Sequence, residues 1–151
     1  VLQSHIMDKE TASRYVSEDA MAFIDSITDM LNAPYFAMNG MEPVSISMEK
    51  VSVKMKVRPQ DRNSNGFWHG GTIFGVMDHC FAILTNIDGH AVAQNNYINY
   101  YRPGRGDEIV AEAVFINKSK SLYSVEVRAY DGDKMVAAEV CNAFRLKEVH
   151  G

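Results

Sequence analysis

The stretch that decides the fold is Thr72-Ile73-Phe74-Gly75-Val76-Met77-Asp78-His79-Cys80-Phe81-Ala82-Ile83-Leu84-Thr85-Asn86, preceded by Asn63-Ser64-Asn65-Gly66-Phe67-Trp68-His69-Gly70-Gly71. The longer stretch is apolar on nearly all sides, which predicts a buried helix. The glycine-rich run places free backbone N–H groups at the start of that helix, where they hold negative charge well. A lone carboxylate, Asp78, lies two turns into the helix, where it is costly without a partner or a function. Together these features predict a site that attacks a carbonyl and stabilises the resulting oxyanion.

Segments with strand-like patterns lie on both sides of this helix. They are 44–57, 91–101, 108–117, 122–130 and 135–146. The first changes parity near Glu49 and Lys50, which predicts one strand with a bulge or bend. The last four have short connections, with Asp131-Gly132 suited to a hairpin turn, so we expect an antiparallel meander.

The segment before the first strand predicts one more helix. Ser17 is a suitable N-cap, and apolar residues at helical spacing follow it as far as Leu31. Pro34 ends this helix, and residues 7–15 are expected to lack regular structure. The order of elements predicts an α+β fold in which a long curved antiparallel sheet wraps one central buried helix, with the N-terminal helix in addition.

The uncovered side of the central helix predicts a second subunit. Gly71, Gly75 and Ala82 are small and share one helix face with Asp78, which suits close packing against another copy. The chain of 151 residues fits one domain, here residues 7–151, while residues 1–6 resemble a vector-derived remnant.

Composition excludes several function classes. The net charge of −4 comes without a dense Lys or Arg run, which argues against nucleic-acid binding. No apolar run is long enough to cross a bilayer and no secretory signal pattern is present, so we expect a cytoplasmic protein without membrane association. Cys80 and Cys141 lack metal-ligand spacing, so we expect core residues in a reducing compartment and no metal site.

The motif residues resemble those of the hotdog-fold acyl-CoA thioesterases, in the phenylacetyl-CoA thioesterase-like branch. They are Asn63, Gly66, His69-Gly70-Gly71 and Asp78, followed by Asn99-Tyr100-Tyr101-Arg102-Pro103-Gly104 and Gly106-Asp107. The resemblance covers residues 44–147. It implies an acyl-CoA thioester substrate, a homodimer or homotetramer, no metal, and no cofactor beyond the coenzyme A of the substrate. Some relatives carry Ser or Thr near the attacking water, where this chain has Ala93-Gln94-Asn95-Asn96.

The resemblance also implies roles for individual residues. It makes Asp78 the general base or nucleophile and the Gly70 N–H the oxyanion donor. Asn63 and His69 then arrange the site, which completes the expected catalytic set. The expected substrate-binding residues are Gly71, Phe67, Trp68 and Phe74.

Structural roles remain open for several of these residues. Asp78 is also compatible with a core carboxylate paired with Arg102 or capped by a backbone amide. Gly70-Gly71 is compatible with a tight turn into the helix. Phe67 and Trp68 suit an acyl pocket and loop packing equally well.

Helix geometry adds a constraint that does not depend on the family. Gly70 and Asp78 are eight positions apart, which is about 12 Å along a helix axis. Both cannot contact one carbonyl, whose partners must lie about 3 Å away. Two antiparallel copies of the helix solve this, because Asp78 of one subunit then meets Gly70 of the other. The sequence therefore predicts two equivalent sites per dimer, each built from both chains.

Two other functions are compatible with such a scaffold. One is a hotdog hydratase or dehydratase that acts on acyl thioesters, although the His and acidic residues of those motifs are not found here. The other is a non-catalytic module that binds acyl-CoA.

Overall fold

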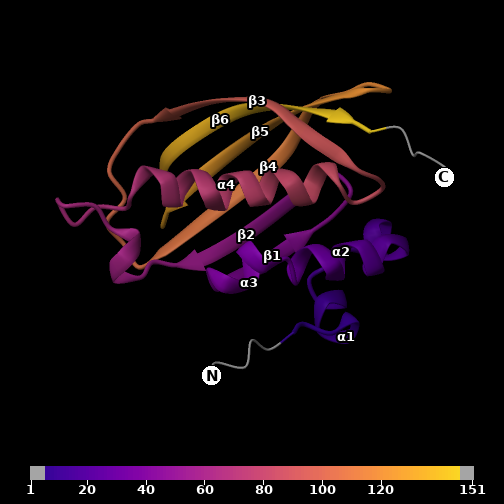
Figure 1. Cartoon of the computed structure of the whole chain (residues 1–151), viewed down its shortest axis with the longest axis horizontal. Coiled ribbons are helices and arrows are strands. Elements are labelled where there is room, and N and C mark those ends of the chain that lie inside the picture. The colour runs from indigo at the N-terminus through magenta and orange to yellow at the C-terminus, as the bar shows by residue number, and fades with distance from the viewer. Residues whose placement is uncertain (1–5, 147–151) are drawn as a thin grey trace.

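A computed structural model describes residues 6–146, and it confirms the predicted α+β architecture (Figure 1). The helices are α1 (Lys9–Ser13), α2 (Ile24–Leu31), α3 (Pro34–Met38) and α4 (Gly70–Thr85), with 3-10 helices η1 (Glu18–Phe23) and η2 (Pro59–Asp61). The strands are β1 (Met41–Ile46), β2 (Lys50–Lys56), β3 (Ala91–Tyr100), β4 (Glu108–Lys118), β5 (Leu122–Asp131) and β6 (Lys134–Arg145). Apart from Ile6, the residues of the expected remnant lie outside the described part of the chain.

The six strands form one antiparallel sheet in the order β1-β2-β4-β5-β6-β3. The predicted meander is right for β4, β5 and β6 but wrong for β3, which pairs with β6 at the far edge. The cause is the loop 101–107. Tyr101 at its start donates to the carbonyl of Val136 in β6, and Asp107 at its end accepts from Val57, which follows β2. The loop therefore crosses the sheet and delivers the chain to β2.

The predicted single strand 44–57 is wrong, because it is a hairpin of β1 and β2. Ser47 closes the turn: its amide donates to the Lys50 carbonyl at 2.8 Å and its hydroxyl accepts from the Lys50 amide at 3.0 Å. A serine side chain thus makes the tight turn that glycine usually provides. The change of parity at Glu49 and Lys50 marks this turn and not a bulge.

The N-terminal region is more broken than predicted. The expected helix from Ser17 to Leu31 is divided into η1 and α2, and α3 follows with Pro34 in its first turn. Residues 9–13 form α1 instead of irregular chain, because the Asp8 carboxylate caps the helix by accepting from the Thr11 amide at 2.8 Å. These short helices lie along one side of α4 (Figure 1).

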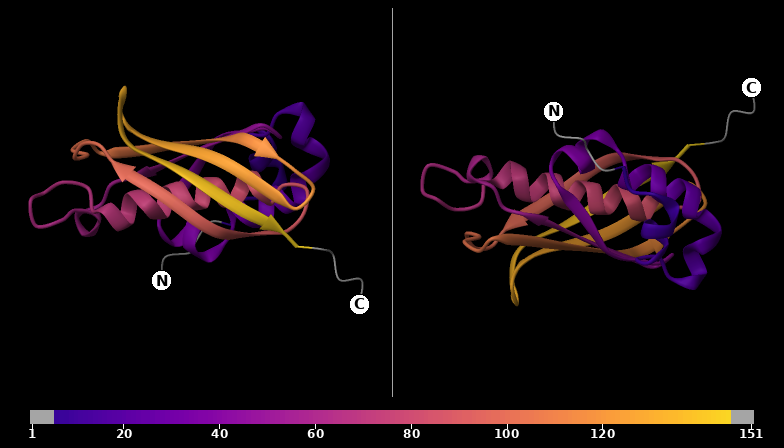
Figure 2. Two further views of the ribbon diagram at one scale, coloured as in Figure 1. Left: turned by 90° about the horizontal axis from the view of Figure 1, so that it is seen from above. Right: turned by 90° about the horizontal axis from the view of Figure 1, so that it is seen from below.

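The core lies between α4 and the concave face of the sheet, which wraps the helix in both views of Figure 2. Small and β-branched residues occupy that face, so the helix approaches closely. Fully buried examples are Val51, Val53, Ala111, Ala113, Val125, Val127, Ala129 and Ala137. The predicted burial of α4 is confirmed along most of its length. Within the described residues, no helix is both long enough and apolar enough to span a bilayer.

Candidate active site

The start of α4 leaves one backbone N–H free. His69 is the N-cap, and its Nδ1 accepts from the Gly71 amide at 2.9 Å. The His69 carbonyl accepts from the amides of Thr72 and Ile73. Among the described residues, the Gly70 N–H has no acceptor. This arrangement satisfies every donor of the first turn except the one that the sequence predicts to hold an oxyanion.

A buried carboxylate anchors the loop that leads into α4. Asp61 accepts hydrogen bonds from the backbone and the guanidinium of Arg58, with its Oδ2 at 2.9 Å from Arg58 Nε. Its own carbonyl accepts from the His69 amide at 2.7 Å. The Arg58 hydrogen bonds hold the pKa of the Asp61 carboxyl below its ordinary value. Arg58 and Asp61 therefore fix where the helix begins.

Asn63 organises the tip of this loop. Its Oδ1 accepts from the amides of Asn65 and Phe67 at 2.9 and 3.2 Å. Gly66 adopts a φ of +78°, a conformation that side chains disfavour. The side-chain oxygen of Asn63 thus shapes the loop, and its side-chain nitrogen has no hydrogen-bond partner among the described residues.

Trp68 joins this loop to the loop 101–107. Its indole is 3% exposed, its Nε1 donates to the Gly106 carbonyl at 2.8 Å, and its ring covers Gly104. The indole ring leaves no room for a side chain at Gly104. Beside it, Arg105 lies over the Phe67 ring at 4.7 Å. Packing of the two loops is therefore one role of Trp68.

The two loops and the start of α4 enclose a cavity of about 400 Å³. It is lined by Asn63, Phe67, Trp68, Gly70, Ile73, Tyr100, Tyr101, Arg102, Pro103 and Gly104. Four of the eight predicted site residues thus meet at one cavity. His69 and Gly71 are exposed at the adjoining helix start, and Phe74 is half-buried one turn further along α4.

Asp78 is half-buried two turns beyond this cavity and is not among its lining residues. Its Oδ1 accepts from Asn96 Nδ2 on β3 at 3.3 Å. Across the described residues no basic side chain forms an ion pair with Asp78, so pairing with Arg102 is wrong. Asn96 stands in the segment that departs from the family pattern, and its contact with Asp78 was not predicted.

β3 touches α4 at both of these positions. The Tyr100 hydroxyl donates to the Gly70 carbonyl at 3.1 Å, and Asn96 reaches Asp78 as described. Tyr100 and Asn96 are four strand positions apart, about 13 Å, and Gly70 and Asp78 are eight helical positions apart, about 12 Å. The spacing along β3 therefore matches the spacing along α4. The edge strand β3 therefore makes one hydrogen bond to Gly70 and one to Asp78, the two main predicted catalytic residues.

The small-residue face of α4 is partly covered by the same chain. Tyr35 on α3 packs against Gly75 so closely that a Cβ there would overlap its hydroxyl. The neighbouring His79 packs on Phe36 with ring centroids 4.9 Å apart, and burial lowers its pKa. The expectation that this face is open to another helix is therefore wrong at Gly75.

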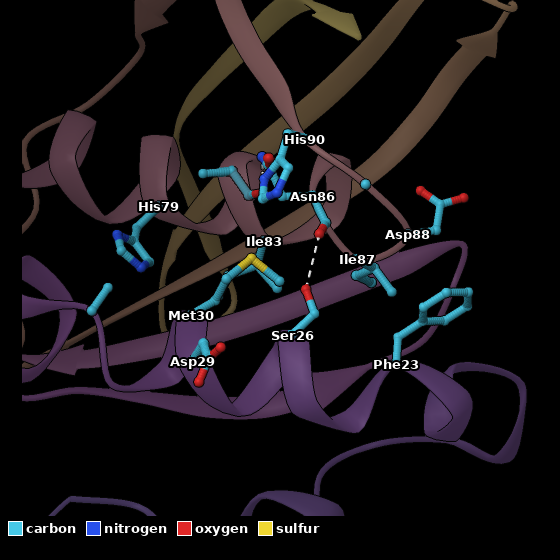
Figure 3. Close-up of a pocket in the computed structure, with 13 residues that line it drawn as sticks. Phe23, Ser26, Asp29, Met30, His79, Ile83, Asn86, Ile87, Asp88 and His90 are labelled. Atoms are coloured by element: carbon cyan, nitrogen blue, oxygen red, sulfur yellow. Dashed lines mark hydrogen bonds between the residues drawn. The ribbon is translucent and has the colours of Figure 1, made fainter. Parts of the chain in front are cut away.

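A second, larger cavity of about 680 Å³ lies between α2 and the C-terminal half of α4 (Figure 3). Ser26 and Asn86 both line it, and the Ser26 hydroxyl donates to the Asn86 carbonyl at 3.3 Å. His79 lines one wall. The two cavities share no lining residue.

One buried carboxyl group near Asp78 was not predicted from the sequence. Glu139 on β6 is 2% exposed and faces the core. Cys80 and Cys141 are buried free thiols, as predicted. Residues 6–146 contain no group of three His, Cys, Asp or Glu side chains placed to hold a metal ion.

Comparison with known proteins identifies the family. The thioesterase superfamily matches residues 65–138, which include the His-Gly-Gly segment and Asp78. A putative esterase of Deinococcus radiodurans is 30% identical over 106 residues, covering 68% of this chain and 73% of that protein. The acyl-coenzyme A thioesterase PaaI of Escherichia coli is 33% identical over 92 residues, covering 58% and 66%.

The solved structure of the E. coli PaaI protein shares the fold, with a TM-score of 0.80 over 86% of this chain and 97% of that chain at 24% identity. The chain belongs to the thioesterase superfamily, in its hotdog-fold, PaaI-like branch. It is therefore a thioester hydrolase, as the motif predicted.

Proposed function

We propose that the protein hydrolyses acyl-CoA thioesters at a site that two subunits build together. The Gly70 N–H of one subunit holds the thioester oxygen, and Asp78 of the partner subunit activates the attacking water. The acyl-CoA substrate class is supported by the E. coli relative, which is an acyl-coenzyme A thioesterase. The main support for a shared site is the free N–H of Gly70. It lies at a cavity that Asp78 of the same chain does not line.

The proposed reaction uses only groups of the chain and water. The Asp78 carboxylate takes a proton from water as the oxygen bonds to the thioester carbon. The carbonyl oxygen becomes an anion, which the Gly70 N–H stabilises in the transition state. Collapse breaks the carbon–sulfur bond, and the departing thiolate receives the proton from Asp78. Direct attack by Asp78, with later hydrolysis of the anhydride, is the other route open to the same residues.

A single two-fold axis is compatible with the positions of these residues on both α4 and β3. The midpoint between Gly70 and Asp78 on α4 is Phe74, and the midpoint between Tyr100 and Asn96 on β3 is Ile98. An axis that passes beside these midpoints exchanges Gly70 with Asp78 of the partner subunit. β3 is an edge strand and, within the part of the chain that the structure describes, pairs only with β6, so its other edge can pair across this axis.

The surface of β3 supports the same arrangement. Tyr97 is 72% exposed, and Val92 and Tyr100 are about half exposed. Exposed aromatic and branched side chains on an edge strand are typical of an interface between subunits. We therefore propose a homodimer through β3, which a further pairing can extend to a homotetramer.

Two substitutions at Gly70 test the oxyanion donor. Proline is favoured at the first position of a helix, and the His69 ψ of 132° suits a residue before proline. Gly70→Pro therefore removes the N–H while keeping the helix start. Gly70→Ala keeps the N–H, and its Cβ would lie 3.7 Å from the Tyr100 ring, an ordinary contact. We expect kcat for acyl-CoA hydrolysis to fall about 100-fold or more in Gly70→Pro. Gly70→Ala should stay within about tenfold of the parent, and equal activity of both variants would exclude the Gly70 N–H as oxyanion donor.

Mixing two inactive variants tests whether the site is shared. Asp78→Asn and Gly70→Pro are each expected to be inactive as homodimers. A mixed dimer has one complete site, from Gly70 of one chain and Asp78 of the other. Random assortment makes half of the dimers mixed, so co-expression should restore about a quarter of the parent activity. No recovery, when differently tagged chains are shown to copurify, would mean that each site lies within one chain.

A further inference from the structure

Glu139 is a buried carboxyl group without a hydrogen-bond partner. It lies in the middle of β6, is 2% exposed, and neither carboxyl oxygen has a partner among the described residues. Burying an unpaired carboxylate is costly, so such a group either holds a proton or serves a function.

The neighbours of Glu139 place it beside Asp78. On β6 it stands opposite Ile98 of β3, and the next inward-facing residue, Cys141, stands opposite Asn96. Asn96 in turn donates to Asp78. Residues that are diagonal across two antiparallel strands share one face within reach of a long side chain. Glu139 and Asn96 therefore approach the same side of α4, where Asp78 projects.

Within residues 6–146, the charged and titratable groups found around Glu139 include no cation. On the strand to its other side the facing residue is the apolar Val127. The groups that interact with Glu139 electrostatically are Asp78 and Cys80 on α4, Tyr100 on β3 and Cys141 on β6. Burial raises the pKa of Glu139 to about 7, the Cys141 thiol lowers it, and the negative charge of Asp78 raises it further.

We propose that Glu139 is a positioning residue of the active site, which keeps a proton so that Asp78 carries the single negative charge of the two carboxyls. This inference rests on the proposed role of Asp78 as the group that activates water. Of two neighbouring carboxyls, the more buried one is favoured to keep its proton, because burial penalises its charged form. Glu139 is the more buried of the two, whereas Asp78 is half-buried and accepts a hydrogen bond from Asn96.

The proposal predicts how activity depends on pH. As the pH rises through the titration of Glu139, a second negative charge appears next to Asp78. That charge opposes the oxyanion of the transition state, so kcat should fall about tenfold between about pH 6 and pH 8.5. KM should change little, because the thioester carbonyl is uncharged when the substrate binds.

The test compares the pH profiles of kcat for the parent and for Glu139→Gln, which is neutral at every pH. The alkaline fall should disappear in Glu139→Gln. A matched control is Glu126→Gln on β5, because Glu126 is paired with Arg128 and stands beside the outward-facing Val140 of β6. The control should keep the parent profile. A parent kcat that is flat over this range, or an alkaline fall that survives in Glu139→Gln, would overturn the proposal.

Three further tests keep the outcome clear. Infrared spectroscopy of the resting protein should detect the C=O band of a protonated carboxyl that titrates near pH 7 and is missing in Glu139→Gln. If Glu139→Gln does not fold, Glu139→Leu suits the apolar surroundings and should give the same flat profile. Asp78→Asn separates the two proposals. Full activity of that variant would remove the proposed function, whereas an inactive Asp78→Asn with an unchanged profile in Glu139→Gln removes only the role of Glu139.

Discussion

The Tyr100 hydroxyl donates to the carbonyl of Gly70 at 3.1 Å, so the edge strand holds the first peptide of the central helix. Tyr100 is half exposed, and this hydrogen bond fixes the Gly70–Gly71 peptide next to the free N–H of Gly70. We expect Tyr100→Phe to lower the free energy of unfolding by about 1 kcal/mol. Thioesterase kcat should fall severalfold, because the proposed oxyanion donor, the Gly70 N–H, becomes less rigid. Denaturant unfolding and steady-state kinetics measure both, and Tyr15→Phe, at a tyrosine between α1 and η1 that does not line the cavity, is the control that should change neither.

His69 allows a separation of capping from proton transfer. Its Nδ1 accepts from the Gly71 amide, which is the contact of an N-cap. His69→Asn restores a cap acceptor but cannot transfer protons near neutrality, whereas His69→Ala does neither. We expect His69→Ala to lose about 1 kcal/mol of stability, and His69→Asn to keep both the stability and most of the activity. A His69→Asn variant that is stable but inactive would show that the imidazole does more than cap the helix.

Asp61 should make the loop before α4 sensitive to acid. Arg58 holds the pKa of the Asp61 carboxyl below its ordinary value of 3.8, so the unfolded chain binds this proton first as the pH falls. The stabilisation is present above about pH 4 and is lost as the pH falls through the lower folded pKa. Asp61→Asn should therefore lower Tm at pH 7 by several degrees and have a smaller effect at pH 3. Thermal unfolding at the two pH values measures this, and an equal loss at both would contradict it.

Glu139 should have the opposite effect on stability. Its folded pKa of about 7 exceeds the ordinary value of 4.5, so the folded state binds the proton more tightly. The contribution of this proton to the free energy of unfolding is fully present below about pH 4.5 and is lost as the pH rises through about 7. The loss corresponds to about 3 kcal/mol. Glu139→Leu should gain stability relative to the parent by up to this amount on going from pH 5 to pH 8. Urea unfolding at both pH values tests it, and a constant difference would contradict it.

Local sequence pattern predicted the elements whose environment is simple. The run from Thr72 is apolar all round, so only a buried helix suits it, and α4 follows within two residues at its start and one at its end. The hairpin of β1 and β2 was not predicted, because Ser47 closes the turn with its side chain and the turn contains no Gly or Pro. The place of β3 depends on how far the loop 101–107 travels, which no local pattern encodes.

The candidate site was predicted only as far as the motif reaches. Asn63, Gly70 and the two aromatic residues meet at one cavity because they adjoin in sequence. Glu139 was missed because β6 is apolar on both faces, so alternation does not tell which face carries the glutamate. Its position beside Asp78 follows from the register of β3 against β6, with Ile98 opposite Glu139.

Trp68 is the only tryptophan in the chain, and its indole lines the cavity at the start of α4. Its ring is held by Gly104 and its Nε1 by the Gly106 carbonyl. All tryptophan fluorescence of the protein therefore originates from one fixed ring at the mouth of the proposed site. Emission intensity can report occupancy of that cavity by unreacted ligands and thiol products, with no label attached.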